Sequence, residues 1–531
     1  MQSHGLAACL TTLVLTTLSM PRALYGQAPT EQPDKTIEKP AETPPADAPA
    51  PPPPASEAPA PPPPADLQPP QPPPVTEPPP LPAPVPTPAA PAVVATPAPA
   101  AAPEQPLAGF SDGTPFLRSA DNFYLLFPGG QLQVDSYFYK SANKVPNNGI
   151  FVRRARAELS GWIGPMFYFS LGGDFAAGPP PAADPVAPAS LITTDDYIAL
   201  APFETRAIFQ VGQFDAPFTF ENRVSSKYTD FLERAVPIRA LGISANKEQG
   251  LMVHGILPND VVYYSFGVFD GDGQTFRNVD NSFDFMGRAW LSLLPSSLSS
   301  TIAIRAGGSV WLGNRKNALA MASQSTEAGF TFWKPSFTGP MMVPFELHQD
   351  GSVRGYAGDL RLSIQQKIGL QFEWLQKQQT FGVADVSKAS SGTLNILGHG
   401  TLDGGGGYAE VWYWVIGDQT IIGEQGLQLQ TRWKKFGTAT PRQGLMVASR
   451  IEYMKETVST DSMTAAQGIA PPQVGTTTLT AFTIGVNYWW SKRMRACLNY
   501  VFNSFGGSAK IITGLPSMSE HELLMRVALT L

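Results

Sequence analysis

Basic residues recur at two places in the chain where they could bind an oxyanion. Arg154 and Arg156 stand two positions apart, so on a strand both side chains would lie on one face. A second group lies in a polar stretch further along the chain. The planar guanidinium fork of arginine binds phosphate and carboxylate oxygens bidentately. We take seven basic residues as candidates for an anion-attracting constriction: Arg154, Arg156, Arg206, Arg223, Lys227, Arg234 and Arg239.

The polar stretch from Asp215 to Lys247 begins after a strand-like segment and ends where strand-like sequence resumes. A connection of that length is too long for an ordinary hairpin, and such loops usually carry function or are disordered. We expect it to fold inward and narrow the interior. The alternative is that its bases serve only to pin the loop, by pairing with four acidic residues: Glu221, Asp230, Glu233 and Glu248.

Short segments of alternating apolar and polar residues make up the rest of the chain after the first hundred residues. Phe285, Leu291 and Leu293 alternate with Asp284 and Arg288, which is typical of half-exposed strands. We count about sixteen such segments. They start near Gln131, Ile150, Met166, Asp195, Thr205, Gln249, Val261, Ser282, Thr301, Val353, Lys367, Gly407, Gly444, Thr478, Met494 and Glu520.

The connections between these segments alternate in length. Short turns, such as 161–165, 258–260 and 490–493, are followed by long loops, such as 215–247 and 313–352. Short turns on one rim and long loops on the other are the plan of an outer-membrane β-barrel. The connection 418–443 is long although it should lie on the short-turn rim. The sequence predicts an all-β fold, an antiparallel transmembrane barrel of about sixteen strands over residues 107–531.

Two segments precede the barrel. Residues 1–27 resemble a secretory signal peptide, with an apolar run from Leu6 to Met20. A lipoprotein reading of Cys9 is less favoured, because the cysteine precedes the apolar run. Residues 28–106 are dominated by Pro and Ala, which predicts a disordered or polyproline II arm reaching on the order of 200 Å. The arm is either a spacer or a tether that touches peptidoglycan.

Charge and cysteine content restrict the function further. Nine of the 43 acidic and three of the 37 basic residues precede Leu107, which leaves 34 of each from there on. A neutral body predicts no partner from its total charge, so only the local arrangement can select a solute. If Cys9 leaves with the signal peptide, Cys497 is left without an intrachain disulfide partner.

Enzyme and nucleic-acid functions find no support in the sequence. His254, His348, His399 and His521 are far apart and form no metal-binding spacing. No nucleophile motif, phosphate loop or nucleic-acid module is present. We therefore expect no catalytic residues, no metal and no cofactor.

Four separated elements resemble one known family. The stretch Gly212-Gln213-Phe214-Asp215-Ala216-Pro217-Phe218 and the later Phe231-Leu232-Glu233-Arg234 resemble a loop element of the phosphate-selective porin O and P family. Similar elements of that family lie at 151–161, 250–271 and 485–501. The resemblance covers about residues 110–531.

The resemblance implies an outer-membrane porin that lets small hydrophilic solutes diffuse passively and favours anions such as phosphate. It also implies a homotrimer in contact with outer-membrane lipid. Two alternatives remain open: a non-selective or carbohydrate porin, and a non-conducting barrel anchor or adhesin tethered through the Pro-rich arm.

Overall fold

The computed structural model describes most of the chain after residue 105. The described ranges are 106–111, 114–141, 148–177, 190–257, 261–274, 278–294, 301–338, 343–385, 396–422, 442–460, 474–507 and 518–531. The expected signal peptide, and the expected arm up to residue 105, lie outside these ranges. Among the described residues, no helix is long and apolar enough to cross a membrane.

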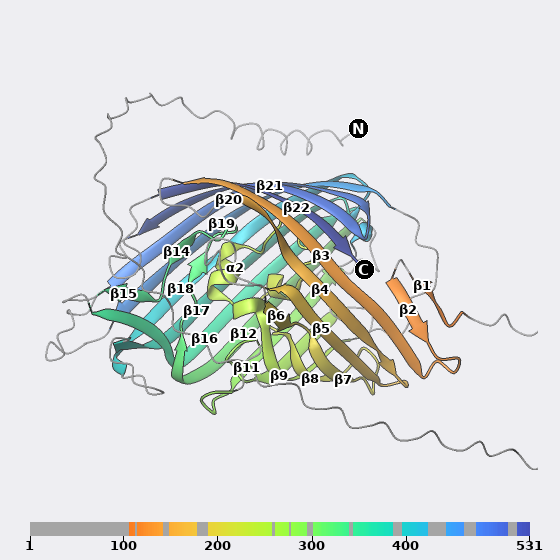
Figure 1. The fold of residues 1–531 in the computed structure, drawn as a ribbon, viewed down its shortest axis with the longest axis horizontal. Coiled ribbons are helices and arrows are strands. Elements are labelled where there is room, and N and C mark those ends of the chain that lie inside the picture. The colour runs from red at the N-terminus through yellow and green to blue at the C-terminus, as the bar shows by residue number, and fades with distance from the viewer. Residues whose placement is uncertain are drawn as a thin grey trace, which may run out of the picture. The chain divides into compact units, whose positions relative to one another are not determined.

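Sixteen antiparallel strands pair with their neighbours in chain order and close into a barrel (Figure 1). The last strand pairs with the first, which places Arg526 opposite Asp135. Closure leaves no unpaired edge, as hydrocarbon requires. The strands are β3 (Tyr124–Ser141), β4 (Gly149–Ile163), β5 (Phe167–Ala177), β7 (Asp196–Leu200), β8 (Ile208–Asp215), β9 (Lys247–Ile256), β10 (Val262–Phe269), β11 (Asp284–Leu294), β12 (Ile302–Ala320), β16 (Pro344–Ile364), β17 (Ile368–Asp385), β18 (Ile396–Ile416), β19 (Gly444–Thr460), β20 (Val474–Ser491), β21 (Met494–Gly507) and β22 (Met518–Thr530).

Shorter elements accompany the barrel. A hairpin of β1 (Ala108–Ser111) and β2 (Thr114–Arg118) precedes it, and β6 (Ser190–Thr193) pairs with β5. The connection between β12 and β16 carries β13 (Gln324–Ser325), β14 (Thr331–Trp333) and β15 (Ser336–Thr338). The few helical turns are η2 (Glu221–Arg223), α2 (Val236–Leu241), η3 (Ser244–Asn246) and η7 (Gln419–Ile421).

The two faces of each strand differ as the alternation predicts. On β11, Phe285, Leu291 and Leu293 are exposed on the outer face, whereas Asp284 and Arg288 are buried inside. This is the pattern of a barrel with lipid outside and polar groups inside. The expected sixteen-strand barrel is therefore confirmed.

Aromatic side chains lie near both ends of the outer face. Trp374 and Tyr453 are stacked with ring centroids 6.4 Å apart, and Tyr413 and Trp490 are exposed near the opposite rim. Such rings suit the two membrane–water interfaces. Trp412, by contrast, is buried inside, because neighbouring residues on a strand face opposite ways.

The rims alternate as expected, but the strand bounds differ from the sequence-based ones. Short turns join β4 to β5, β16 to β17 and β20 to β21, and the connection 417–443 opens on that same rim. The expected loop 313–352 is shorter in the structure, because β12 continues to Ala320 and β16 starts at Pro344. These strand extensions lie beyond the lipid-facing apolar band, and in β16 their apolar residues Phe345 and Leu347 face the interior.

The segment 216–246, here called loop 3, lies inside the barrel, where Figure 1 shows α2 enclosed by strands. Its apolar residues Phe218, Ile238 and Leu241 are fully buried in a cluster with side chains of β12 and β16 to β20. The Phe218 ring meets the Trp311 ring at a centroid distance of 5.5 Å. Loop 3 is therefore held against one side of the inner wall by apolar packing.

Candidate functional site

The interior has a filled side and a hollow side. The filled side is an apolar cluster in which residues of loop 3 and of the β12–β16 connection pack with side chains of strands β8 to β12 and β16 to β21. On the hollow side, beside β4 to β8, lie two cavities of about 480 Å³ and about 290 Å³. The larger, here the upper chamber, faces the long-loop rim. The smaller, here the lower chamber, faces the short-turn rim.

The two chambers share a boundary. Ser225 and Ser226 of loop 3 line the upper chamber, and the next residue, Lys227, lines the lower one. On β4, Arg156 borders the upper chamber and Glu158 the lower. A path from one chamber to the other would therefore pass this level of β4 and loop 3.

Basic residues outnumber acidic residues around the upper chamber. Six basic and four acidic side chains line it, which gives an excess of two positive charges when all are ionised. The basic residues are Arg153, Arg154, Arg156, Arg234, Arg239 and Lys247, and the acidic ones are Asp174, Asp195, Asp215 and Glu233.

Ion pairs fix most of these side chains. Arg156 Nε lies 2.9 Å from Asp174 Oδ2. Lys247 Nζ lies 2.7 Å from Asp195 Oδ1 and 2.8 Å from Asp215 Oδ1. The chamber therefore presents oriented charges, which need little rearrangement to receive an ion.

Glu233 of loop 3 contacts three arginines of the wall. Its carboxylate accepts from Arg153 Nε at 3.1 Å, Arg154 Nη2 at 3.3 Å and Arg526 Nη2 at 3.0 Å. Burial acts to raise the pKa of Glu233, but the arginine charges outweigh burial and hold that pKa well below its usual value. Glu233 is therefore ionised at neutral pH.

At the boundary, loop 3 is attached directly to the wall. The Lys227 ammonium pairs with the Glu158 carboxylate. The Ser226 backbone oxygen accepts from Gln133 Nε2 at 3.1 Å, and its hydroxyl accepts from Gln131 Nε2 at 3.2 Å. These bonds join loop 3 to β3 and β4, so an ion moving between the chambers would have to pass beside the Lys227–Glu158 pair.

The structure brings five of the seven candidate residues to the chambers. Arg154, Arg156, Arg234 and Arg239 line the upper chamber and Lys227 lines the lower. Arg223 points away, to the Asp215 backbone oxygen and, at 3.1 Å, to the Tyr263 hydroxyl. Arg206 is exposed in the turn between β7 and β8, on the short-turn rim. The sequence did not separate these two from the others, because the charge pattern does not show how far along the barrel axis a residue lies.

The pinning alternative receives partial support. Arg234 donates to the backbone oxygens of Glu221 and Val224, at 2.8 Å and 2.6 Å, so it stabilises loop 3 as well as lining the chamber. Two of the four acidic residues do not pair with bases of loop 3 as that alternative predicts. Glu221 and Glu233 form ion pairs with arginines of the barrel wall, on β4, β19 and β22.

Sequence reasoning missed Arg153. Strict alternation places Arg153 outside and Arg154 inside, but the register of β3 and β4 shifts between Gln133 and Val134, so that Gln133 pairs with Arg154 and Val134 with Val152. This bulge leaves Arg153 without an opposite residue and lets both guanidinium groups reach Glu233. A bulge of this kind has no sequence signal.

A second inward segment was also missed. Residues 321–338, here called loop 5, bury Phe330, Phe332 and Trp333 against the interior. Its Glu327 lies 2.6 Å from Arg450 Nη2, and Arg450 also contacts Glu221 and Glu452. The apolar run Phe330 to Trp333, in a connection expected to be a polar loop, was the available signal.

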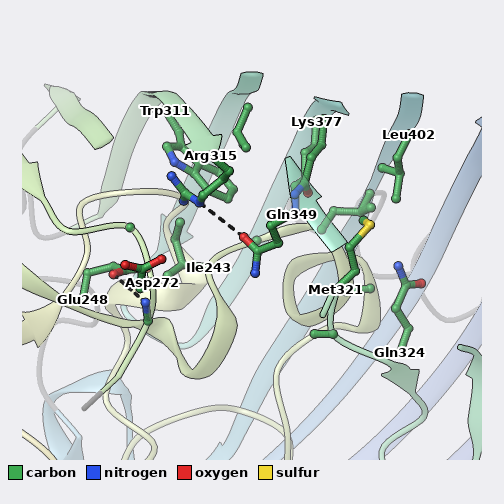
Figure 2. A pocket seen from close by; sticks show the side chains of 18 of the residues that line it. Ile243, Glu248, Asp272, Trp311, Arg315, Met321, Gln324, Gln349, Lys377 and Leu402 are labelled. Atoms are coloured by element: carbon green, nitrogen blue, oxygen red, sulfur yellow. Dashed lines mark hydrogen bonds between the residues drawn. The ribbon is translucent and has the colours of Figure 1, made fainter. Parts of the chain in front are cut away.

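A third cavity, of about 90 Å³, is lined by residues 240–243 of loop 3 and by strands of the filled side (Figure 2). Figure 2 shows Glu248 and Asp272 close together, with Arg315 near them and Lys377 further away, beyond Arg315. Two basic and two acidic side chains line it, and Arg315 donates to Gln349 at 3.2 Å. Leu241, which lines this cavity, belongs to the apolar cluster that fills that side. This balanced, small cavity is a poorer candidate for a path.

Residues 128–294 match the sequence model of a family described as phosphate-selective porin O and P. No curated protein sequence matches the chain. Three solved structures illustrate the similar folds. The outer membrane channel DcaP of Acinetobacter baumannii has 10% identity and a TM-score of 0.43, covering 78% of this chain and 99% of DcaP.

The anion-selective porin from Comamonas acidovorans has 10% identity and a TM-score of 0.41, covering 77% of this chain and all of that one, 100%. OmpT of Vibrio cholerae has 10% identity and a TM-score of 0.44, covering 78% and 99%. Similarity at this level concerns the fold alone. The closed barrel, together with the match of residues 128–294 to the phosphate-selective porin O and P model, identifies this chain as an outer-membrane porin.

Proposed function

We propose that this porin favours small anions such as phosphate, and that they pass through the two chambers between loop 3 and the β4 to β8 wall. The observation that carries the proposal is the excess of basic over acidic side chains around the upper chamber, six against four. The barrel as a whole has no such excess, so selection would occur at this level of the path.

The physical basis is electrostatic. A unit charge about 6 Å from a monovalent anion contributes roughly 3 kcal/mol at an effective dielectric constant of about 20. Paired acids cancel much of this, which leaves a modest preference and keeps binding weak enough for release. Guanidinium groups also replace part of the water that an oxyanion loses on entering a narrow passage.

The test is the reversal potential of the purified protein in a planar bilayer under a KCl gradient. We expect anion-favouring permeability in the wild type and a lower anion-to-cation ratio for the double variant Arg154→Gln, Arg156→Gln. Arg206→Gln is the matched control, because it removes one exposed positive charge away from both chambers. An equal fall in the control, or no fall in the double variant, would contradict the proposed path.

The same recordings separate the alternatives. A reversal potential near zero would favour a non-selective or carbohydrate porin. Protein that folds and never conducts would favour a barrel anchor or adhesin tethered through the arm. The family and the fold point to a channel and not to an enzyme.

Three further features belong to the proposal. We expect export through a signal peptide over residues 1–27, a homotrimer in the outer membrane, and contact of the arm at 28–106 with peptidoglycan. Chemical crosslinking of membranes tests the trimer. Co-sedimentation of cell wall with protein lacking residues 30–105 tests the arm, and unchanged co-sedimentation would contradict the contact.

A further inference from the structure

The carboxylate of Glu233 occupies a site that has the chemistry of an anion-binding site. Two guanidinium groups from the upper chamber, Arg153 and Arg154, reach its oxygens at 3.1 Å and 3.3 Å. Arg154 Nη1 also donates to Gln133 Oε1 at 2.7 Å, so its position does not depend on Glu233 alone. Forked donors of this kind bind carboxylate and phosphate oxygens equally well.

We propose that Glu233 is an internal ligand of this guanidinium pair, which competes with passing carboxylate or phosphate oxyanions and thereby sets how tightly the channel holds them. The inference rests on the proposed function, since it concerns the same chamber. It makes Glu233 a positioning residue that limits affinity and speeds release.

The site is reachable from the chamber. The Arg153 and Arg156 side chains keep 23% and 20% of their surface exposed, while the Glu233 side chain keeps 7%. An entering anion can therefore approach Arg153 before Glu233 leaves it. Displacement would proceed by exchange of one oxyanion for another, with no bare guanidinium left buried in between.

The third arginine has a different task. Arg526 lies 2.7 Å from Asp135 through both Nε and Nη2, and donates to the Leu232 backbone oxygen at 2.6 Å. Its contact with Glu233, at 3.0 Å, is one of several, so it stays satisfied when Glu233 moves. Arg153 and Arg154 are the pair that an anion would take over.

Movement of Glu233 needs no movement of loop 3. Phe231 and Leu232, which precede it, are each 1% exposed, and Arg234, which follows it, bonds to the backbone of Glu221 and Val224. The backbone is thus fixed on both sides. A change of side-chain rotamer into the chamber, which Glu233 already lines, suffices.

Two variants test the inference. Glu233→Gln keeps the shape and removes the charge, so the excess of basic side chains around the chamber rises from two to three. We expect phosphate to reduce chloride conductance at a concentration about tenfold lower than in the wild type, the equivalent of roughly 1.4 kcal/mol. The control Glu346→Gln makes the same charge change at the partly exposed rim and should leave phosphate block unchanged.

Glu233→Ala tests the ligand role without a conductance measurement. This variant leaves room for an added carboxylate, so acetate or phosphate should raise the thermal unfolding temperature of the purified variant. The ionic strength is kept constant by replacing a bulky sulfonate with acetate or phosphate. The wild type and Glu346→Gln, in which Glu233 competes with the added anion, should show a smaller rise. This rescue would not occur if Glu233 only filled space.

The outcomes separate this inference from the proposed function. Wild-type protein without anion preference would contradict the proposed function. Wild-type protein that favours anions, with unchanged phosphate block in Glu233→Gln and no anion rescue of folded Glu233→Ala, would overturn the inference alone. If Glu233→Ala does not fold even in acetate, Glu233→Gln decides, and unchanged block in that variant overturns the inference.

Discussion

Replacing Arg450 by Met should remove one attachment that both inward loops share with the barrel wall and so loosen them. The Arg450 side chain is fully buried, and its guanidinium lies 2.6 Å from Glu327 of loop 5, 3.4 Å from Glu221 of loop 3 and 2.7 Å from Glu452 of β19. Met matches the length of the side chain but leaves all three carboxylates without this partner. Arg450 therefore joins three parts of the interior at one point.

The size of the effect follows from the burial. Removing one partner of a buried ion pair costs about 3–5 kcal/mol, and three carboxylates at one place favour the upper end of that range. Burial raises the pKa of Glu221 and raises that of Glu327 well above its usual value, although Arg450 opposes both shifts. Protonation of these two acids limits the loss, so we expect about 4 kcal/mol near neutral pH.

The pH dependence has a definite sign. Without Arg450, the pKa values of Glu221 and Glu327 in the folded state rise further above their unfolded values, so the folded state binds more protons. Its stability then increases as the pH falls toward the unfolded pKa. The stability gap between wild type and Arg450→Met should therefore narrow from pH 8 to pH 5.

Guanidinium unfolding in detergent, followed by tryptophan fluorescence, measures this gap, and single-channel recordings report loop motion as current noise. Arg354→Met, at an exposed position on β16, is the matched control and should stay within about 0.5 kcal/mol of wild type. A quiet Arg450→Met channel with wild-type stability would refute the reasoning.

Three further predictions concern the β1 and β2 hairpin, the packing of Phe218 and the dependence of anion preference on pH. Phe116 of the β1 and β2 hairpin is 3% exposed within an apolar cluster at the short-turn end, and Thr114 of the same hairpin lines the lower chamber. Phe116→Ala should therefore loosen the hairpin beside the lower chamber and raise conductance; equal conductance would contradict this. Phe218→Ala should cost about 3–5 kcal/mol in guanidinium unfolding, against less than about 1.5 kcal/mol for Phe218→Leu, and similar costs would argue against anchoring by Phe218. Because the pKa of Glu233 is depressed, the stability it contributes persists at every pH above its unfolded value and is lost as pH falls through the folded one. Anion preference in reversal-potential measurements should rise more through that acidic range in the wild type than in Glu233→Gln, which keeps only the three aspartates of the upper chamber.

The barrel could be predicted from sequence because the alternation of apolar and polar residues can be recognised within each strand. Each strand must show apolar residues to lipid at every second position, and each of the sixteen expected segments corresponds to one barrel strand. Strand ends were less predictable. β16 already begins at Pro344, where Phe345 and Leu347 face the interior cluster and not lipid, so the outward apolar pattern does not mark this part of the strand.

The site could be predicted only in part. The pair Arg154 and Arg156 follows from alternation, whereas Arg153 enters the interior through a bulge that depends on the pairing of β3 with β4. Arg206 and Arg223 are basic but lie away from both chambers. Their charge alone could not show their position along the barrel axis. Under the pinning alternative Glu233 would pair with bases of its own loop, whereas its partners lie on β4 and β22 and are set by the folding of the whole barrel.

The central claim is that ions pass on the β4 side of loop 3 and not through the filled side. A cysteine at Ser225, which lines the upper chamber, and one at Gln349, which lines the small cavity, compare the two routes in a Cys497→Ser background. An anionic methanethiosulfonate reagent should lower single-channel conductance stepwise for Ser225→Cys and leave Gln349→Cys unchanged. The reverse pattern, or block at both positions, would contradict the path.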